Sequence, residues 1–316
     1  MTRENTAELW DGVWDRPAPI ERDLYAVAKE ERLIRWQRIE ALILARFGGF
    51  ANLSVIEVGA GRGTNSALMA RRGARVTVLD YSESALERSR RLFDGLELPV
   101  ELVLQDALDL PESLRGKYDV SMSFGLAEHF LGDSRRAVLQ AHFDLLKDGG
   151  LAFISVPNAH NPPYRLYKWI TEKTGRWSIG EEYPFSRPEL ERYCGVLGVE
   201  EYGFFGDSLW RSKKFLNPIK WVPRRKKKPA RRTASAPAGG HEASPHAQRE
   251  PAKDAPSKGE PSKGEPSKGK RARSKRRYRR LPRRERGTRW DARFSYALVL
   301  WASKPKSGAA TRAREP

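Results

Sequence analysis

Hydrophobic residues recur along the chain at two different periods, and the two periods predict different elements. Over residues 21–47 the spacing is helical, which predicts one long amphipathic helix ended by Gly48 and Gly49. From there to residue 157, short apolar runs alternate with further helical patterns; the runs are LSVIEVG, ARVTVLD, PVELVLQDA, YDVSMSFG and LAFISVP. Strands that alternate with helices are typical of a parallel sheet covered on both faces. We therefore predict an α/β fold for this part of the chain.

Two later segments predict the rest of the sheet. VEEYGFFG is predicted as a sixth strand, and ARFSYALVLWA, residues 292–302, as a seventh. Two Ser-x-x-Glu patterns, from Ser84 to Glu87 and from Ser186 to Glu189, are typical of capping boxes. They mark the predicted starts of two helices.

Charge is distributed very unevenly over the 316 residues. The formal net charge is +19, yet residues 211–289 hold 28 Lys and Arg against 6 Asp and Glu, so the remaining chain is close to neutral. Residues 223–277 contain no Ile, Leu, Val, Met, Phe, Trp or Tyr, and they include the repeats PSKGE, PSKGE and PSKGK. Such a segment cannot bury enough apolar surface to offset the entropy of ordering it. We predict a disordered basic insertion over residues 211–289.

The basic insertion would attract polyanions, and three interpretations stay open. It can be a solvated segment with weak nonspecific binding, it can contact RNA or the ribosome, or it can contact an anionic membrane or an acidic protein. Tyr278 is the one aromatic side chain inside the basic run that could stack on a base. Recognition of a particular RNA sequence is therefore not expected.

Cysteine content and hydropathy exclude several classes of protein. Because Cys194 is the single cysteine, no intramolecular disulfide and no cysteine-based zinc site can form, and we predict no metal site. The apolar runs are too short for a signal peptide or a transmembrane helix. We expect a cytoplasmic protein without a transmembrane segment.

The stretch VIEVGAGRGTNSALMA, residues 55–70, joins the first predicted strand to a helix through three glycines. Gly59, Gly61 and Gly63 let the backbone approach a ligand closely, since glycine has no Cβ and accepts positive φ. The dinucleotide fingerprint G-x-G-x-x-G would need a glycine where Thr64 stands, so the spacing does not fit NAD. Glu57 precedes the loop, and its carboxylate suits a ligand that carries an ammonium group better than one that carries a pyrophosphate.

The pattern E-x-G-x-G-x-G, from Glu57 to Gly63, resembles the first motif of class I S-adenosylmethionine-dependent methyltransferases. The resemblance spans about residues 50–205 and the last strand. It implies S-adenosyl-L-methionine as the cofactor and a Rossmann-like, doubly wound, seven-stranded sheet whose last strand is antiparallel. The expected parts are an N-terminal helical extension or lid (1–49), a core (50–210 and 290–303), the disordered basic insertion (211–289) and a disordered tail (304–316).

The resemblance also implies cofactor-binding residues after the second, third and fourth strands. Asp80 would accept hydrogen bonds from the ribose hydroxyls, and Tyr81 would lie along the adenine. Asp106, followed by Ala107, would receive the adenine amino group. Phe124 opens the segment FGLAEHF, where many small-molecule methyltransferases carry a similar Glu-His pair. Simpler roles stay open for these residues, as a helix cap, a surface aromatic or a turn residue.

His129 and Glu128 are the catalytic candidates. In methyl transfer the protein mainly aligns the acceptor with the methyl group, and a general base helps when the acceptor is a hydroxyl or a protonated nitrogen. His129 suits that role by its pKa and position, and Glu128 has the same standing. Either residue can instead be purely structural.

The acceptor is expected to bind in the least regular segment, between the fifth and sixth strands. Asn158, Tyr164 and Trp169 are the candidate acceptor-binding residues, although the aromatic residues there can equally form the core-facing stripe of a helix. Trp10 and Trp14 are candidates for a lid over the cofactor. The predicted function is methyl transfer to an O, N or C nucleophile of a small molecule. The alternatives are an RNA-, ribosome- or protein-modifying methyltransferase guided by the basic insertion, and a noncatalytic nucleic-acid-binding protein that retains the fold.

Overall fold

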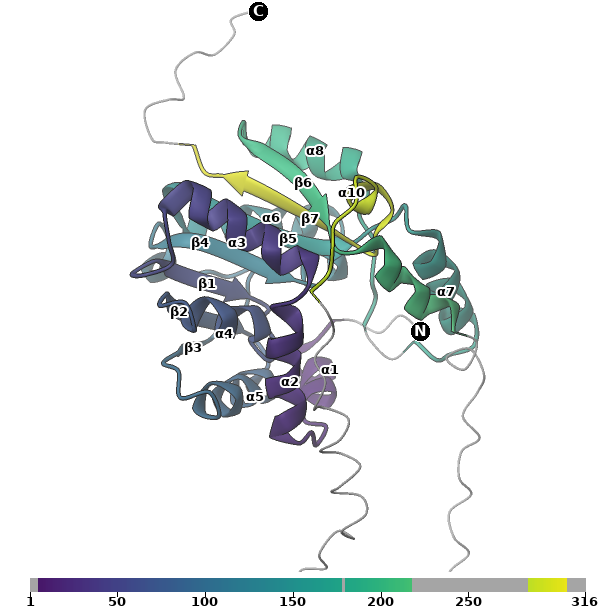
Figure 1. Ribbon diagram of the computed structural model, residues 1–316, viewed down its shortest axis with the longest axis horizontal. Helices are drawn as coiled ribbons and strands as arrows, with labels where there is room; N and C mark the ends of the chain where they lie inside the picture. The colour runs from purple at the N-terminus through teal and green to yellow at the C-terminus, as the bar shows by residue number, and fades with distance from the viewer. Residues whose placement is uncertain (1–4, 178–179, 218–283, 306–316) are drawn as a thin grey trace, which may run out of the picture.

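A seven-stranded sheet runs through the molecule (Figure 1). The computed structural model describes residues 5–177, 180–217 and 284–305. The strands lie in the order β3-β2-β1-β4-β5-β7-β6, and their bounds are β1 Ser54–Val58, β2 Arg75–Asp80, β3 Glu101–Leu104, β4 Tyr118–Phe124, β5 Leu146–Pro157, β6 Tyr202–Gly206 and β7 Ala297–Ser303. β7 pairs antiparallel with β5 and β6, and the other neighbouring strands are parallel. The predicted doubly wound sheet with an antiparallel last strand is confirmed.

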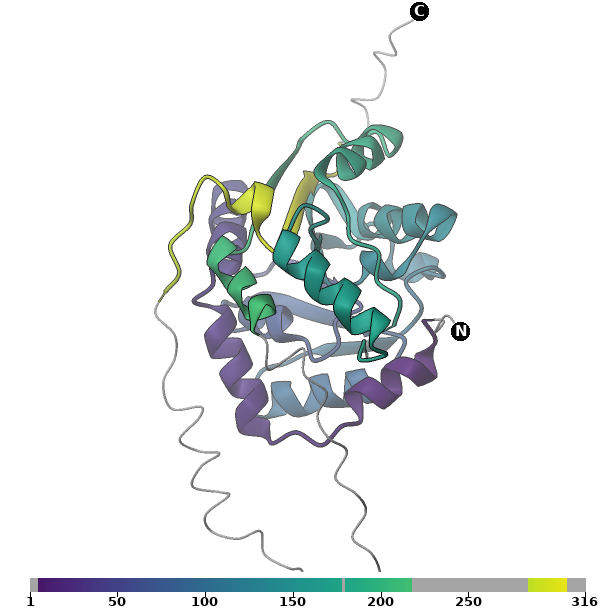
Figure 2. The same cartoon turned by 90° about the vertical axis from the view of Figure 1, so that its right-hand side faces the viewer.

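Helices cover both faces of this sheet. Their bounds are α1 Ala7–Trp14, α2 Ile20–Glu30, α3 Ile34–Phe47, α4 Thr64–Ala70, α5 Glu83–Asp94, α6 Gly132–Leu145, α7 Pro162–Lys173, α8 Arg187–Val196 and α10 Asp291–Phe294, with short 3-10 helices η1 Glu112–Leu114, η2 Ala127–His129 and η3 Leu209–Leu216. On one face α3, α4 and α5 bury side chains such as Trp36, Leu68 and Phe93. On the other face α6 and α8 bury Leu139 and Leu190 (Figure 2). Both faces are apolar, as a parallel sheet requires.

The long helix predicted over residues 21–47 is wrong, because the chain breaks it into α2 and α3. The break is held by a residue distant in sequence. Glu285 accepts a hydrogen bond at 3.2 Å from the first amide of α3, at Ile34, and its own amide donates at 2.9 Å to the carbonyl of Arg32. Both helices keep an apolar side toward the molecule, so the hydrophobic pattern alone could not reveal the break.

Of the two predicted capping boxes, one is confirmed and one is displaced. The side chain of Ser186 accepts a hydrogen bond from the amide of Glu189 at the start of α8, and the carboxylate of Glu189 accepts one from the amide of Ser186. Before α5 the capping residue is Ser82, whose hydroxyl accepts a hydrogen bond from the amide of Ala85 at 3.1 Å. Ser84 lies inside the helix instead, because β2 ends at Asp80 and the helix begins sooner than expected.

The β6–β7 connection holds the segment predicted as the basic insertion. Its first residues, Arg211–Leu216, continue η3, and residues 284–290 return along the junction of α2 and α3. Residues 218–283, where most of the predicted disorder falls, lie outside the described residues. No helix in the described ranges is both long and apolar enough to span a bilayer.

Helix α2 is fastened to the glycine-loop side of the sheet by a buried carboxylate. Asp23 is 1% exposed and accepts hydrogen bonds from Nε of Arg88 at 3.0 Å and from its Nη2. Arg62, from the glycine loop, donates to the same carboxylate at 3.1 Å. The ion pairs hold α2 over the loop that follows β1.

Candidate functional site

The carboxyl ends of the central strands meet at a cavity of about 440 Å³. The cavity lies where the strand order reverses, between β1 and β4, which is the usual ligand position in open α/β sheets. Figure 2 looks onto this edge of the molecule. Helices α1 and α2 add an outer wall through Trp10, Trp14 and Lys29. The N-terminal helices therefore lie where a lid over the cavity was predicted.

The glycine loop lines the cavity with two of its three glycines. Gly59 and Gly61 have φ of 61° and 57°, and a Cβ on either would lie 2.7 Å from Leu126 or 2.3 Å from Trp14. Gly63 also has a positive φ, of 67°, but a Cβ there would crowd Ser89 and Phe93. The third glycine therefore serves close packing of α4 and α5 rather than the cavity.

Glu57 brings a buried carboxyl to the end of β1. It is 2% exposed and lines the cavity, and its Oε2 accepts hydrogen bonds from the amide of Ser66 at 2.9 Å and from the Ser66 hydroxyl. Burial raises the pKa of Glu57 to about 7. Beside it, Oδ1 of Asn65 is buried without a hydrogen-bond partner among the described residues. This end of the cavity presents acceptors that a cationic, hydrogen-bond-donating group would satisfy.

Asp80 holds the end of β2 against the glycine loop. Its carboxylate accepts hydrogen bonds from the amides of Gly61 at 2.8 Å and Ser82 at 3.0 Å. Burial raises the pKa of Asp80 to about 6. Tyr81 follows in the cavity wall, and its hydroxyl donates to the carbonyl of Asn5 at 3.3 Å. Burial, and next the charge of Asp80, raise the pKa of Tyr81.

The loop after β3 supplies the far end of the cavity. Asp106 and Ala107 both line it. Asp106 is exposed, and one of its carboxylate oxygens accepts a hydrogen bond from the amide of Leu108 at 2.9 Å. The carboxyl group is therefore held by a local turn while its side chain remains accessible from the cavity.

His129 lies at the meeting point of three segments. Its Nδ1 lies 2.6 Å from the carbonyl oxygen of Glu181, and the edge of Trp10 contacts its ring at a centroid distance of 4.9 Å. Asn5 donates to the carbonyl of His129 at 2.7 Å. A carbonyl accepts but cannot donate, so Nδ1 carries the proton and Nε2 keeps a free lone pair. Burial lowers the pKa of His129, which favours this neutral form.

Glu128 is buried beside the cavity without lining it, unlike its neighbour. It is 4% exposed and does not line the cavity, and its Oε2 has no hydrogen-bond partner among the described residues. Burial, and next the nearby Glu182, raise the pKa of Glu128 well above its ordinary value. Of the two neighbours in η2, His129 lines the cavity and Glu128 does not.

The three predicted acceptor-binding residues are not brought to this cavity. Asn158 is buried, and its amide donates at 3.1 Å to the carbonyls of both Arg293 and Ser295, which ties β5 to β7. Tyr164 is 1% exposed and donates to Glu182 at 2.6 Å. Trp169 lies on the outer side of α7 and is 58% exposed. The aromatic spacing around Tyr164 therefore marks a helix packed on the core, the alternative that the sequence had left open.

Phe124 lines the cavity, and its ring contacts a residue that the sequence did not indicate. The guanidinium of Arg35, from α3, lies over the Phe124 ring at 4.9 Å and also lines the cavity. Its Nε donates to Glu30 at 2.9 Å, and its charge acts on Glu57. Nothing in the spacing of α3 distinguishes Arg35 from the other arginines of that helix.

Within the residues that the structure describes, no three His, Cys, Asp or Glu side chains are grouped so that they could hold a metal ion.

The comparisons with known proteins agree with the site. A family model described as a methyltransferase domain matches residues 55–150. A ubiquinone biosynthesis O-methyltransferase from Pseudomonas putida is 32% identical over 163 residues, which cover 49% of this chain and 68% of that protein. A protein of the same description from Shewanella pealeana is 36% identical over 119 residues, 37% of this chain and 49% of that protein. A solved magnesium protoporphyrin IX methyltransferase from Synechocystis matches at 20% identity with a TM-score of 0.45, over 62% of this chain and 86% of that one.

The chain belongs to the class I S-adenosylmethionine-dependent methyltransferases. It spans about half the length of several of the curated relatives that it matches. The matched region contains the glycine loop, Asp80, Asp106 and His129, all of which contribute to the lining of the cavity.

The residues present fit the cofactor of this family. Acceptors lie where its cationic and hydroxyl groups would bind: Glu57 and Asn65 at the end of β1, Asp80 at the end of β2, and Asp106 after β3. Arg35 supplies a positive charge near Glu57, where the carboxylate of an amino acid could pair with it. Helix α1 covers the loop from outside through Trp14.

Proposed function

We propose that this protein transfers a methyl group from S-adenosyl-L-methionine to an O, N or C nucleophile of a small-molecule acceptor. The single observation that carries the proposal is that one cavity holds the buried acids of β1 and β2 beside a histidine whose Nε2 lone pair is free. When bound, the cofactor supplies a methyl group activated by its sulfonium. The curated relatives are named as O-methyltransferases, which supports a small hydroxyl-bearing acceptor.

The chain's own residues would perform three tasks. Glu57 and Asn65 would bind the ammonium end of the cofactor, Arg35 would pair with its carboxylate, and Asp80 would orient the ribose. His129, held by Glu181 and Trp10, would accept the proton of an acceptor hydroxyl at Nε2. Trp14 would exclude water above the glycine loop. Glu128, Asn158, Tyr164 and Trp169 take no part in this proposal because they do not reach the cavity.

Methyl-labelled cofactor incubated with the protein and fractionated cell extract tests the proposal. We expect label in the small-molecule fraction, and a loss of that label when Asp80→Ala replaces the wild type. Label found only in RNA or protein would favour a macromolecule-modifying enzyme and contradict the proposal. A cytoplasmic location stays a prediction from the short apolar runs of the sequence.

We also propose that the basic insertion contacts polyanions such as RNA or an anionic membrane. The support is compositional: residues 218–283 hold 22 Lys and Arg against 5 Asp and Glu. The described ends of the insertion add exposed Arg284, Arg286 and Arg289. Elution from a heparin column should need raised salt, with affinity falling steeply as salt increases. Elution at low salt would overturn this second proposal.

A further inference from the structure

The cavity has a second half, beyond the residues assigned to the cofactor. The strand order places Asp106, Asp80 and Glu57 along β3, β2 and β1, so the cofactor would occupy that side. On the other side β4, β5 and β6 end, and the antiparallel β7 begins. We call this the acceptor half, and define it by the lining residues Lys29, Glu30, Phe124, His129 and Arg211.

Two cations, Lys29 and Arg211, and one carboxylate, Glu30, line the acceptor half, and the carboxylate is already paired with Arg35. Nε and Nη2 of Arg35 both donate to Oε1 of Glu30, and Nη1 lies 3.4 Å from the hydroxyl of Ser155. The ring of Phe124 covers one face of the guanidinium. Glu30 is therefore neutralised by Arg35, and the charges of Lys29 and Arg211 remain on this side of the cavity.

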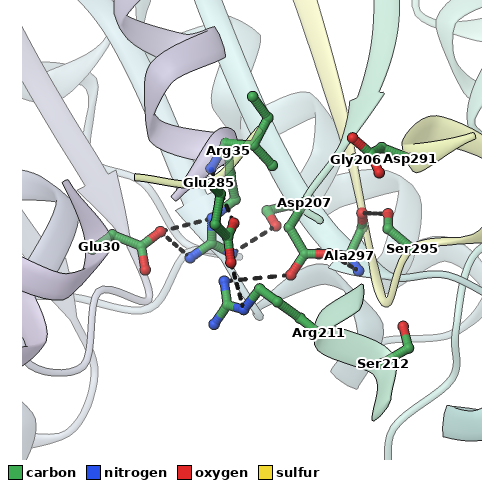
Figure 3. A network of polar contacts seen from close by, with 12 residues as sticks. Glu30, Arg35, Gly206, Asp207, Arg211, Ser212, Glu285, Asp291, Ser295 and Ala297 are labelled. Carbon is green, nitrogen blue, oxygen red and sulfur yellow. Dashed lines mark hydrogen bonds and ion pairs between the residues drawn. The ribbon is translucent and has the colours of Figure 1, made fainter. Parts of the chain in front are cut away.

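Arg211 is oriented by its neighbours without being hydrogen-bonded to them. Figure 3 shows its guanidinium between the carboxyl groups of Asp207 and Glu285. The nearest approaches are 3.6 Å to Asp207 and 3.9 Å to Glu285, too long for hydrogen bonds. Among the described residues, no acceptor takes a hydrogen bond from this guanidinium. Its side chain is 23% exposed and lines both this cavity and an adjoining hollow, so a ligand in the cavity can reach it.

Lys29 adds a second cation, from the last turn of α2. Its side chain lines the same cavity, and no hydrogen bond or ion pair joins its ammonium to a residue within 5–177, 180–217 or 284–305. The carboxyls beside Arg211 do not line this cavity: Asp207 is buried behind it, and Glu285 lines a neighbouring hollow with Trp210 and Arg286. Among its described residues, the acceptor half thus offers cationic side chains whose N–H groups make no hydrogen bond. Its one carboxylate, Glu30, is already paired with Arg35.

We propose that the methyl acceptor carries an anionic carboxylate or phosphate group, which Arg211 binds through its unspent N–H donors while Lys29 supplies a second positive charge. The planar fork of a guanidinium matches both anions with paired hydrogen bonds. The inference rests on the proposed function, because it names the class of molecule that the same cavity methylates. Binding at Arg211 directs the reactive end of the acceptor toward His129 and Phe124, at the end of β4.

The test begins with the acceptor itself. Small molecules from the source cells, freed of macromolecules by ultrafiltration, are separated on an anion exchanger before the reaction, and each fraction is incubated with the protein and methyl-labelled cofactor. We expect label to be incorporated only from fractions that the exchanger retained. Incorporation from the unretained fraction alone would overturn the inference and leave the proposed function intact. No incorporation from any fraction would overturn both.

Variants then assign the anion to Arg211. With the active fraction, Arg211→Gln and Lys29→Gln should raise the apparent KM for the acceptor, by about 10- to 100-fold for Arg211→Gln. The cofactor Kd, measured by calorimetry, should stay unchanged in both variants, which shows that the fold and the cofactor half are intact. Arg286→Gln, an exposed arginine of the neighbouring hollow, is the matched control and should keep the wild-type KM. An unchanged KM in Arg211→Gln would contradict the assignment.

Discussion

Two buried carboxyl groups, Glu57 and Asp80, define the chemistry of the cavity at the scale of single residues. Burial raises their pKa values to about 7 and about 6, so each carries an electrostatic cost when ionised without a ligand. A cation placed beside Glu57 would favour its ionised form. The folded protein therefore holds this site at the expense of some stability, as functional sites often do.

The cost at Glu57 predicts a pH dependence of stability. The pKa in the folded protein, about 7, lies above the ordinary value of 4.5, so the stability linked to Glu57 is complete below pH 4.5 and is lost as the pH rises to about 7. The loss amounts to ~3 kcal/mol. In Glu57→Gln the unfolding free energy should fall less over this range than in the wild type, as measured by urea unfolding. Asp106→Asn, an exposed carboxyl of the same cavity, is the control. Equal pH dependence in Glu57→Gln and the wild type would rule out the assigned burial.

His129 is expected to act as the base. Replacing it with Ala should lower kcat about 10²- to 10⁴-fold for a hydroxyl acceptor, while the cofactor Kd changes little. Because burial lowers the pKa of His129, the wild-type rate should fall only below the ordinary titration range of histidine as pH decreases. Steady-state kinetics measures both. His160→Ala removes an exposed histidine that does not line the cavity and should keep the wild-type rate. A kcat of His129→Ala within about threefold of wild type would contradict the role of His129 as the general base.

Sequence motifs located most of the cofactor half but little of the acceptor half. Glu57, Asp80 and Asp106 could be predicted because each stands at or shortly after the carboxyl end of a strand, and these ends meet at one edge of a parallel sheet. Arg35 and Arg211 could not, since the face that a helical arginine presents depends on how its helix packs. Asn158 and Tyr164 lay in the expected segment, yet their side chains are used in buried hydrogen bonds to Arg293 and Glu182.

Among the elements, α2 has the clearest mechanical role, because its Asp23 fastens it to Arg88 and Arg62. Asp23→Ala would leave two buried or half-buried cations unpaired, which typically costs ~3–5 kcal/mol. We expect this loss in urea unfolding, together with weaker cofactor binding as α2 loosens over the glycine loop. Glu87→Ala breaks the fully solvated pair with Arg90, both side chains being 61% exposed, and should cost at most ~1 kcal/mol. Equal losses in the two variants would show that α2 is not held by Asp23.

At this same scale, strands were predictable and helix junctions were not. Each strand carries a short apolar run, because a parallel sheet is covered by helices on both faces and its strands are buried. The break between α2 and α3 depends instead on Glu285, which lies more than two hundred residues away in the sequence. The start of α5 depends on where β2 ends, so two serines close together could not be told apart as caps.

For the whole molecule, the sheet and the basic insertion are expected to function separately. Replacing residues 218–283 with a short Gly/Ser linker should leave β6 and β7 paired, because loop-closure entropy changes by only ~0.6 kcal/mol per doubling of length. The cofactor Kd should therefore stay within about twofold of wild type, while heparin binding is lost. Calorimetry and salt elution measure the two properties. Retention of heparin binding in the deletion variant would place the polyanion contact elsewhere.

Family membership, fold and cavity all converge on a cofactor site, and calorimetric titration with S-adenosyl-L-methionine tests that claim most directly. The wild type should bind, and Asp80→Ala should bind about 10- to 100-fold more weakly, because it loses a buried carboxylate that would orient the ribose. Glu112→Ala, a carboxyl that is 92% exposed and outside the cavity, should bind like the wild type. Absence of binding in the wild type, or equal affinity in Asp80→Ala and the wild type, would contradict the account.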